Sequence, residues 1–98
     1  MTNNSSQTKT RLHVFFSGIV QGVGLRFLVQ KIVSFYTVSG FVKNLYDGRV
    51  ELVLEGDKNI LEEIIKQITS SHLQDYIHEV NQTWDESTGE YAGFKIEF

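Results

Sequence analysis

The spacing of hydrophobic and polar residues changes along this chain, and the first change separates a predicted strand from a predicted helix. Apolar residues alternate with outward-facing ones over residues 12–16, which predicts a strand with one buried face. Over residues 25–38 apolar side chains recur at helical spacing, which predicts an amphipathic helix. Ser39-Gly40 is expected to end this helix, because glycine adopts the left-handed cap conformation at little cost.

Two extended runs follow this first helix. They cover residues 41–46 and 49–55, and Tyr46-Asp47-Gly48 lies between them. Asp-Gly between two such runs is typical of a tight hairpin turn. The pattern therefore predicts two antiparallel strands joined by a short turn.

A second helix is expected after the hairpin. Gly56 is expected to break the strand, and the Asp57 side chain can cap the first amide groups of the helix. A narrow apolar stripe defines its buried face, with acidic and amide side chains outside it. The stripe consists of Ile60, Leu61, Ile64, Ile65 and Ile68.

The rest of the chain predicts two more strands and completes the fold. Residues 77–84 form a less regular strand, residues 87–93 a loop, and residues 94–98 alternate as a short closing strand. The order strand, helix, strand, strand, helix, strand is that of the split β-α-β arrangement of ferredoxin-like folds. Right-handed crossovers place both helices on one side. We therefore predict an α+β, ferredoxin-like βαββαβ sandwich, an antiparallel sheet with two helices on one face.

Composition limits the classes of protein that this chain can be. Its 98 residues are 41% apolar, which suits one domain with a modest core. A net charge of −3 argues against broad nucleic-acid binding, and no apolar run approaches the roughly 20 residues that span a bilayer. The N-terminal residues lack the apolar stretch of a signal peptide. Without cysteine there is no disulfide, thiolate metal site or thiol nucleophile, and residence in the cytoplasm fits.

The most informative stretch is GIVQGVGLR, residues 18–26, between the first strand and the first helix. Its three glycines allow a ligand to approach the main chain and leave amide groups available to it. Arg26 falls in the first turn of the helix, where its guanidinium can bind two phosphate oxygens at once. The stretch predicts an anion cradle, and phosphate is the first ligand to consider.

Two spaced signatures resemble those of the acylphosphatase family. The first is G-x-V-Q-G-V-x-x-R, carried by Gly18, Val20, Gln21, Gly22, Val23 and Arg26. The second combines a glycine, an aromatic, a small apolar residue, a basic residue, an asparagine and three later positions, carried by Gly40, Phe41, Val42, Lys43, Asn44, Gly48, Val50 and Gly56. The ending FKIEF is also similar to the family's last strand.

The resemblance covers residues 11–98 and implies one acylphosphatase-like domain, preceded by a flexible tail over residues 1–10. One position departs from the family pattern. Leu25 stands where the family usually has an aromatic residue before the arginine. We interpret this as a packing change, with an altered support for Arg26 as the alternative.

The resemblance also implies roles for individual residues. Arg26 is implied to bind the substrate, and Asn44 to orient the attacking water in line with phosphorus. A ferredoxin-like sheet is expected to set the second strand beside the first, which brings Asn44 near the loop. The implied phosphate loop consists of Gly18, Val20, Gln21, Gly22, Val23 and Gly24.

A site made of Arg26, Asn44 and backbone amides alone suffices only for a substrate with a good leaving group. Hydrolysis of an acyl phosphate expels a carboxylate, whose conjugate acid has a pKa of about 4, so that no general acid is needed. The phosphoryl oxygens can take the proton of the water, and positioning and electrostatics supply the rest. We expect no cofactor and no metal, because the spacing of His13, His72 and His78 does not suit a metal site.

Several residues have a plainer interpretation beside the functional one. Lys43 matches the family's basic position but is expected to be a solvated strand residue, and the side chain of Gln21 is expected to brace the loop.

The expected partners are a small-molecule acyl phosphate and inorganic phosphate as product or inhibitor, with no nucleic acid and no membrane. We expect a monomer.

Two functions from different classes follow. The first is an acylphosphatase that splits the carboxyl-phosphate bond into carboxylate and inorganic phosphate. The second is a non-catalytic module of ferredoxin-like fold that binds an anion or effector, since this fold hosts many functions. Domains that resemble acylphosphatases also occur inside larger proteins that handle carbamoyl phosphate, and the lack of an attached domain here favours the free enzyme.

Overall fold

The computed structural model describes residues 9–98 and contains five strands and two α-helices. The elements are β1 (Lys9–Gly18), α1 (Leu25–Val33), β2 (Ser39–Asn44), β3 (Val50–Asp57), α2 (Lys58–Thr69), the short 3₁₀ helix η2 (Gln74–Tyr76), β4 (Ile77–Glu86) and β5 (Phe94–Glu97). The prediction of a tail over residues 1–10 falls mostly outside the described residues. Lys9 and Thr10 already belong to β1, paired with Asp57 and Gly56.

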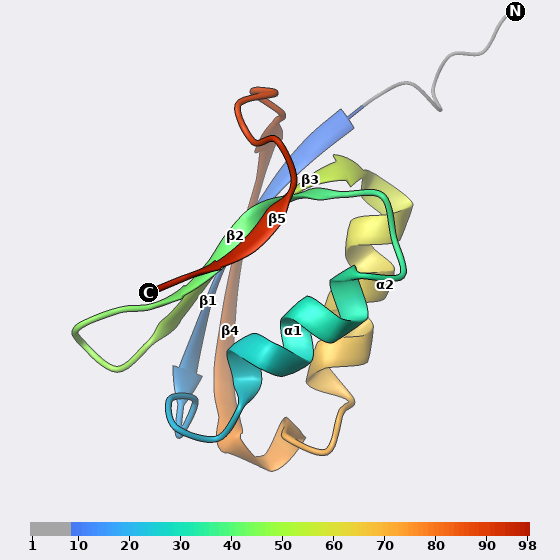
Figure 1. The fold of residues 1–98 in the computed structure, drawn as a ribbon. Helices are drawn as coiled ribbons and strands as arrows, with labels where there is room; N and C mark the ends of the chain where they lie inside the picture. Colours follow the sequence, from blue (N-terminus) through green and yellow to red (C-terminus); the bar gives the residue numbers. More distant parts are fainter. Residues whose placement is uncertain (1–8) are drawn as a thin grey trace, which may run out of the picture.

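The strands form one sheet in the order β4-β1-β3-β2-β5, and both helices cover the same face of it (Figure 1). The predicted α+β, ferredoxin-like fold is confirmed. Four strands pair antiparallel, as expected, whereas β5 pairs with β2 in parallel and makes the sheet mixed. No helix among residues 9–98 is long and apolar enough to cross a membrane.

The core lies between the helices and the inner sheet face. Residues directly opposite in the register share a face, so Leu12 meets Leu54 and Trp84, and Val42 meets Leu52. The apolar stripes of α1 and α2 pack over them. Asn44 pairs with Val50 at the end of β2 and lies on this same inner face, below the start of α1.

The first helix is shorter than predicted. The apolar spacing predicts a helix over residues 25–38, but α1 ends at Val33. Amide groups of Phe35 and Tyr36 donate to carbonyls three residues back, which tightens the chain into a turn. This turn brings the hydroxyl of Tyr36 to Gln67 of α2, whose Nε2 donates to it over 2.6 Å.

Two glycines that the sequence predicts to end an element, Gly40 and Gly56, lie inside strands instead. Gly40 does not cap α1 but lies in β2, where an added Cβ would approach the carbonyl of Val53 to 1.8 Å. Gly56 does not break β3 but lies within it, pressed against Val38. The cap of α2 is as predicted, since the carboxylate of Asp57 accepts from the amide of Asn59 over 2.9 Å.

The neighbours of β1 differ from the expectation. We expected β2 beside β1, but β3 lies between them. The crossover through α1 leaves room for one strand between β1 and β2. The β2–β3 hairpin turns β3 back into this position, antiparallel to both neighbours. Asn44 is therefore one strand farther from β1 than predicted, and another contact must bring it to the loop.

Candidate active site

The glycine-rich loop leaves β1 through a turn that only glycine fits. The register of β1 against β4 shifts between Ser17 and Gly18, and Gly18 has a φ of 126°. A Cβ there would lie 2.4 Å from the carbonyl oxygen of Tyr76. The same carbonyl accepts a hydrogen bond from the amide of Ile19 over 2.9 Å, which fixes the exit of the chain from the sheet.

The loop enters α1 without a side-chain cap. Gly24 is the N-cap residue in the left-handed conformation, with a φ of 91°, and no side chain accepts from the first turn. Within the described chain, the amide groups of residues 20–24 donate to no other backbone group. These groups and the positive end of the helix dipole suit an anion.

Gln21 connects the loop to the hairpin. Its Nε2 donates to the carbonyl of Leu45 over 2.7 Å and to that of Arg49 over 2.9 Å. Both acceptors belong to the β2–β3 turn. The side chain therefore braces the loop, as expected, and holds the end of β2 beside it although β3 separates β2 from β1.

A cavity of about 240 Å³ lies where these elements meet. It is lined by Val20, Gly22, Gly24, Leu25, Arg26, Phe27 and Asn44, and we call it the cradle. Arg26 and Asn44, expected from sequence to act together, both line it. Three other residues of the expected loop do not: Gly18 makes the turn, Gln21 braces, and Val23 packs against the core.

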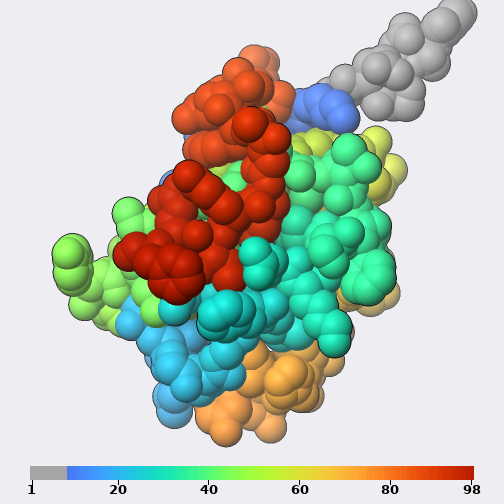
Figure 2. Space-filling model, in the orientation of Figure 1, coloured from blue at the N-terminus to red at the C-terminus, as the bar shows by residue number. Residues whose placement is uncertain are grey.

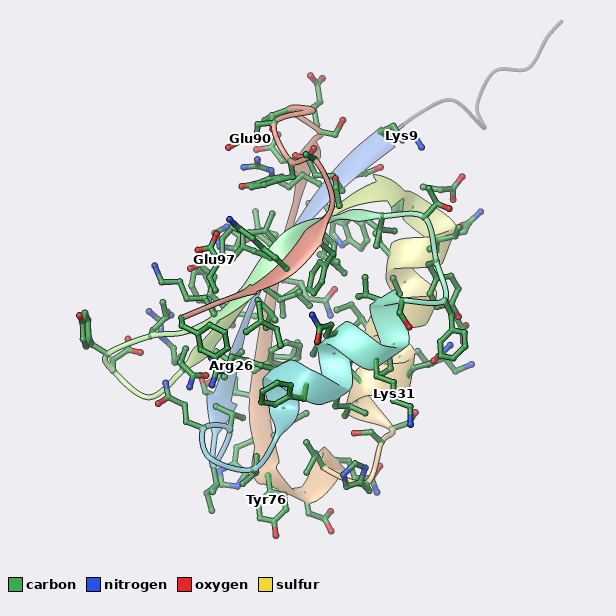
Figure 3. The ribbon with its side chains drawn as sticks, in the orientation of Figure 1. Lys9, Arg26, Lys31, Tyr76, Glu90 and Glu97 are labelled. Atoms are coloured by element: carbon green, nitrogen blue, oxygen red, sulfur yellow. The ribbon has the colours of Figure 1, made fainter. Side chains whose placement is uncertain are left out.

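Arg26 is held by the last residues of the chain. Its Nη1 donates to the carbonyl of Glu97 over a long 3.5 Å, and its Cζ lies 4.8 Å from the ring centroid of Phe98. Figure 3 shows Arg26 between the start of α1 and the end of β5, and Figure 2 shows the C-terminal segment (red) against the start of α1. Sequence reasoning did not assign this support to Arg26, although the alternation of FKIEF pointed to a strand ending at Phe98.

A larger cavity of about 830 Å³ adjoins the cradle at Asn44. Lys43 and Lys95 line it beside Tyr46 and Phe98. Lys43 favours an approaching anion, whereas Lys95 lies 3.9 Å from the carboxylate of Glu97, which lines the same cavity. Lys43 is half-buried at this cavity, whereas the sequence predicts a solvated strand residue.

Leu25, which departs from the family pattern, and His13 lie on opposite faces of the structure: one in the core and one on the open side of the sheet. Leu25 is only 2% exposed and packs in the core, so its side chain contributes to the interior beneath the cradle. His13 faces the open side of the sheet, where its Nε2 lies 2.7 Å from the carboxylate of Glu51. Across residues 9–98, no group of three histidines and acids could hold a metal ion.

Fold and cradle together define a class of protein: a small α+β domain of ferredoxin-like topology with an anion cradle between its first strand and first helix. The family profile described as Acylphosphatase matches residues 12–96. The chain belongs to the acylphosphatase family, hydrolases that act on acid anhydrides.

Individual relatives agree with this assignment. An acylphosphatase from Caldanaerobacter subterraneus subsp. tengcongensis is 38% identical over 88 residues, which is 90% of this chain and 98% of the relative. The crystal structure of acylphosphatase from Bacillus subtilis matches with a TM-score of 0.83 at 29% identity, over 91% of this chain and 99% of that one. The structure of an acylphosphatase from Coxiella burnetii matches with a TM-score of 0.78 at 33% identity, over 99% and 100%.

Proposed function

We propose that this chain hydrolyses acyl phosphates to carboxylate and inorganic phosphate, with the phosphoryl group in the cradle. One observation carries the proposal. Arg26 and Asn44, from separate elements, line the same 240 Å³ cavity as the uncapped start of α1. A phosphoryl group there meets amide donors, the helix dipole and a guanidinium that keeps its charge.

Arg26 acts on the phosphoryl oxygens. Its fork of donors pairs with two oxygens at once and stabilises the charge that they carry in the transition state. The ring of Phe98 and the carbonyl of Glu97 restrict its side chain before substrate arrives. Less conformational freedom is then lost when the substrate binds.

Asn44 acts on the water. Its amide offers both a donor and an acceptor, so it can fix a water molecule by two contacts. Held at the end of β2, that water attacks phosphorus from the sheet side of the cradle. The expelled carboxylate needs no proton, because its conjugate acid has a pKa of about 4. The phosphoryl oxygens accept the proton of the water.

The test is hydrolysis of benzoyl phosphate by the purified chain, with inorganic phosphate as competitor. Arg26→Ala should weaken phosphate inhibition by about 10- to 100-fold, the loss expected for hydrogen bonds to a charged group. Asn44→Ala should lower kcat by about 100-fold or more and leave phosphate inhibition within about twofold, because it removes positioning rather than binding.

Matched controls separate these roles from general damage. Lys66→Ala removes an exposed cation on α2, and Asn81→Ala removes an exposed amide on β4. Both should keep wild-type kinetics. Phosphate binding without turnover by the wild-type chain would instead support the anion-binding module, and full turnover by Asn44→Ala would remove its assigned role.

The proposal extends to how the enzyme works in the cell. We infer that it acts as a monomer. We also infer residence in the cytoplasm. Size-exclusion chromatography and cell fractionation test these two points.

A further inference from the structure

The cradle accounts for the phosphate, and a neighbouring groove accounts for the rest of the substrate. We propose that Phe27 is a specificity-determining residue whose ring binds the acyl group, favouring acyl phosphates with an aromatic or extended apolar acyl chain. This inference rests on the proposed hydrolysis and adds the side from which the carboxylate leaves.

Stereochemistry selects that side. In phosphoryl transfer the attacking and leaving oxygens lie roughly in line through phosphorus. With the water on Asn44, at the sheet wall of the cradle, the acyl oxygen must leave away from β2. The walls that remain are the glycine loop and the first turn of α1, where Leu25 is buried and Phe27 is the exposed apolar lining residue.

Phe27 also belongs to a second cavity. A groove of about 560 Å³ runs along α1 toward the start of β5, and its apolar lining includes Phe27, Val33, Val38 and Phe94. The one residue that the groove shares with the cradle is Phe27. An acyl group attached to a phosphate in the cradle can therefore reach this groove along the Phe27 ring.

Folding does not explain this aromatic side chain. Phe27 is 59% exposed and lies outside the core, while its neighbours Leu25 and Val29 are buried. Phe35, after the same helix, is 78% exposed and lines neither the cradle nor the groove. Phe35 is thus a matched control for an exposed phenylalanine without a ligand.

The experiment compares benzoyl phosphate with acetyl phosphate, whose acyl group is too short to cover the ring. For Phe27→Ala we expect KM for benzoyl phosphate to rise about tenfold, from the apolar area lost. KM for acetyl phosphate, kcat for both and inhibition by inorganic phosphate should stay within about twofold. Phe35→Ala should match the wild type throughout.

Contrary results are equally defined. If the ratio of KM for benzoyl phosphate to KM for acetyl phosphate is unchanged in Phe27→Ala, the proposal is overturned. A loss of inhibition by inorganic phosphate in this variant also overturns it, because Phe27 would then take part in phosphate binding. Tyr46 lines the 830 Å³ cavity beside Asn44. If Tyr46→Ala changes this ratio of KM values, the acyl group lies on the side of the attacking water, and the proposal is overturned. If the wild-type chain hydrolyses neither substrate, the proposed function itself fails and this inference falls with it.

Discussion

Leu25 shows how one residue can depart from a family pattern without entering the chemistry. Both Leu25 and Arg26 line the cradle, but Leu25 is 2% exposed and packs in the core, whereas the guanidinium of Arg26 contacts Phe98. Arg26 is held from the end of the chain rather than by the side chain before it. Leu25 therefore belongs to packing, and its effect on the guanidinium is indirect.

Restoring an aromatic residue at this position tests that view. Leu25→Phe adds volume to a filled interior and should lower the free energy of unfolding by about 1–3 kcal/mol. We expect KM and kcat for benzoyl phosphate to stay within about threefold, because Arg26 keeps its contacts. Urea denaturation and steady-state kinetics measure both. A large kinetic change in a stable variant would show that Leu25 does alter how Arg26 is held.

At the scale of the element, the chain between β1 and α1 has glycines with positive φ at positions 18, 22 and 24, and Gly18 and Gly24 are required for different reasons. Gly18 has a φ of 126° and no space for a Cβ, which would lie 2.4 Å from a carbonyl oxygen. Gly24 has a φ of 91° and nothing within 4 Å of an added Cβ. The first position is limited by close approach and conformation, the second by conformation alone.

Alanine at each position separates the two costs. Gly24→Ala should lower the free energy of unfolding by about 1–2 kcal/mol, the cost of a left-handed residue with a side chain. Gly18→Ala should cost about 3 kcal/mol or more, because backbone must also move away from Tyr76. Urea denaturation at neutral pH gives both values. Equal losses would mean that the sheet yields at Gly18 more easily than its contacts indicate.

At the scale of the whole molecule, a polar network on the open face of the sheet joins segments distant in sequence. Glu55 of β3 is only 5% exposed and accepts from Arg11 Nε over 2.9 Å. It also accepts from the amides of Thr88 and Gly89, over 2.9 and 3.0 Å, in the loop before β5. Burial raises the pKa of Glu55, but these hydrogen bonds outweigh it and hold the pKa below its ordinary value of 4.5.

This lowered pKa makes stability depend on pH. The folded carboxyl remains ionised at a pH at which the unfolded one has already taken a proton. The contribution of Glu55 is therefore complete above about pH 4.5 and is lost as the pH falls through the folded pKa. We expect Glu55→Gln to lower the free energy of unfolding at pH 7 by about 1–3 kcal/mol and to flatten its decline below pH 4.5.

Urea denaturation between pH 7 and pH 2.5 or so measures this dependence. Glu62→Gln is the matched control, since Glu62 is exposed on α2 and should leave the curve nearly unchanged. If wild type and Glu55→Gln decline in parallel, the network does not carry the acid sensitivity.

The sequence by itself determined the elements and their order, because periodicity and turn residues report local burial and local backbone conformation. It also indicated the glycine loop, Arg26 and Asn44. Local pattern placed the C-terminal end of α1 wrongly, since residues 34–38 keep helical spacing while their hydrogen bonds form a turn.

Only the tertiary structure decided which strands are neighbours and what supports the cradle. Strand order placed β3 between β1 and β2, so that the bond from Gln21 to the β2–β3 turn, rather than strand pairing, brings Asn44 to the loop. The carbonyl that contacts Arg26 lies 71 residues away in the chain. Such contacts depend on the register and order of distant strands, which no local pattern of hydrophobic and polar residues specifies.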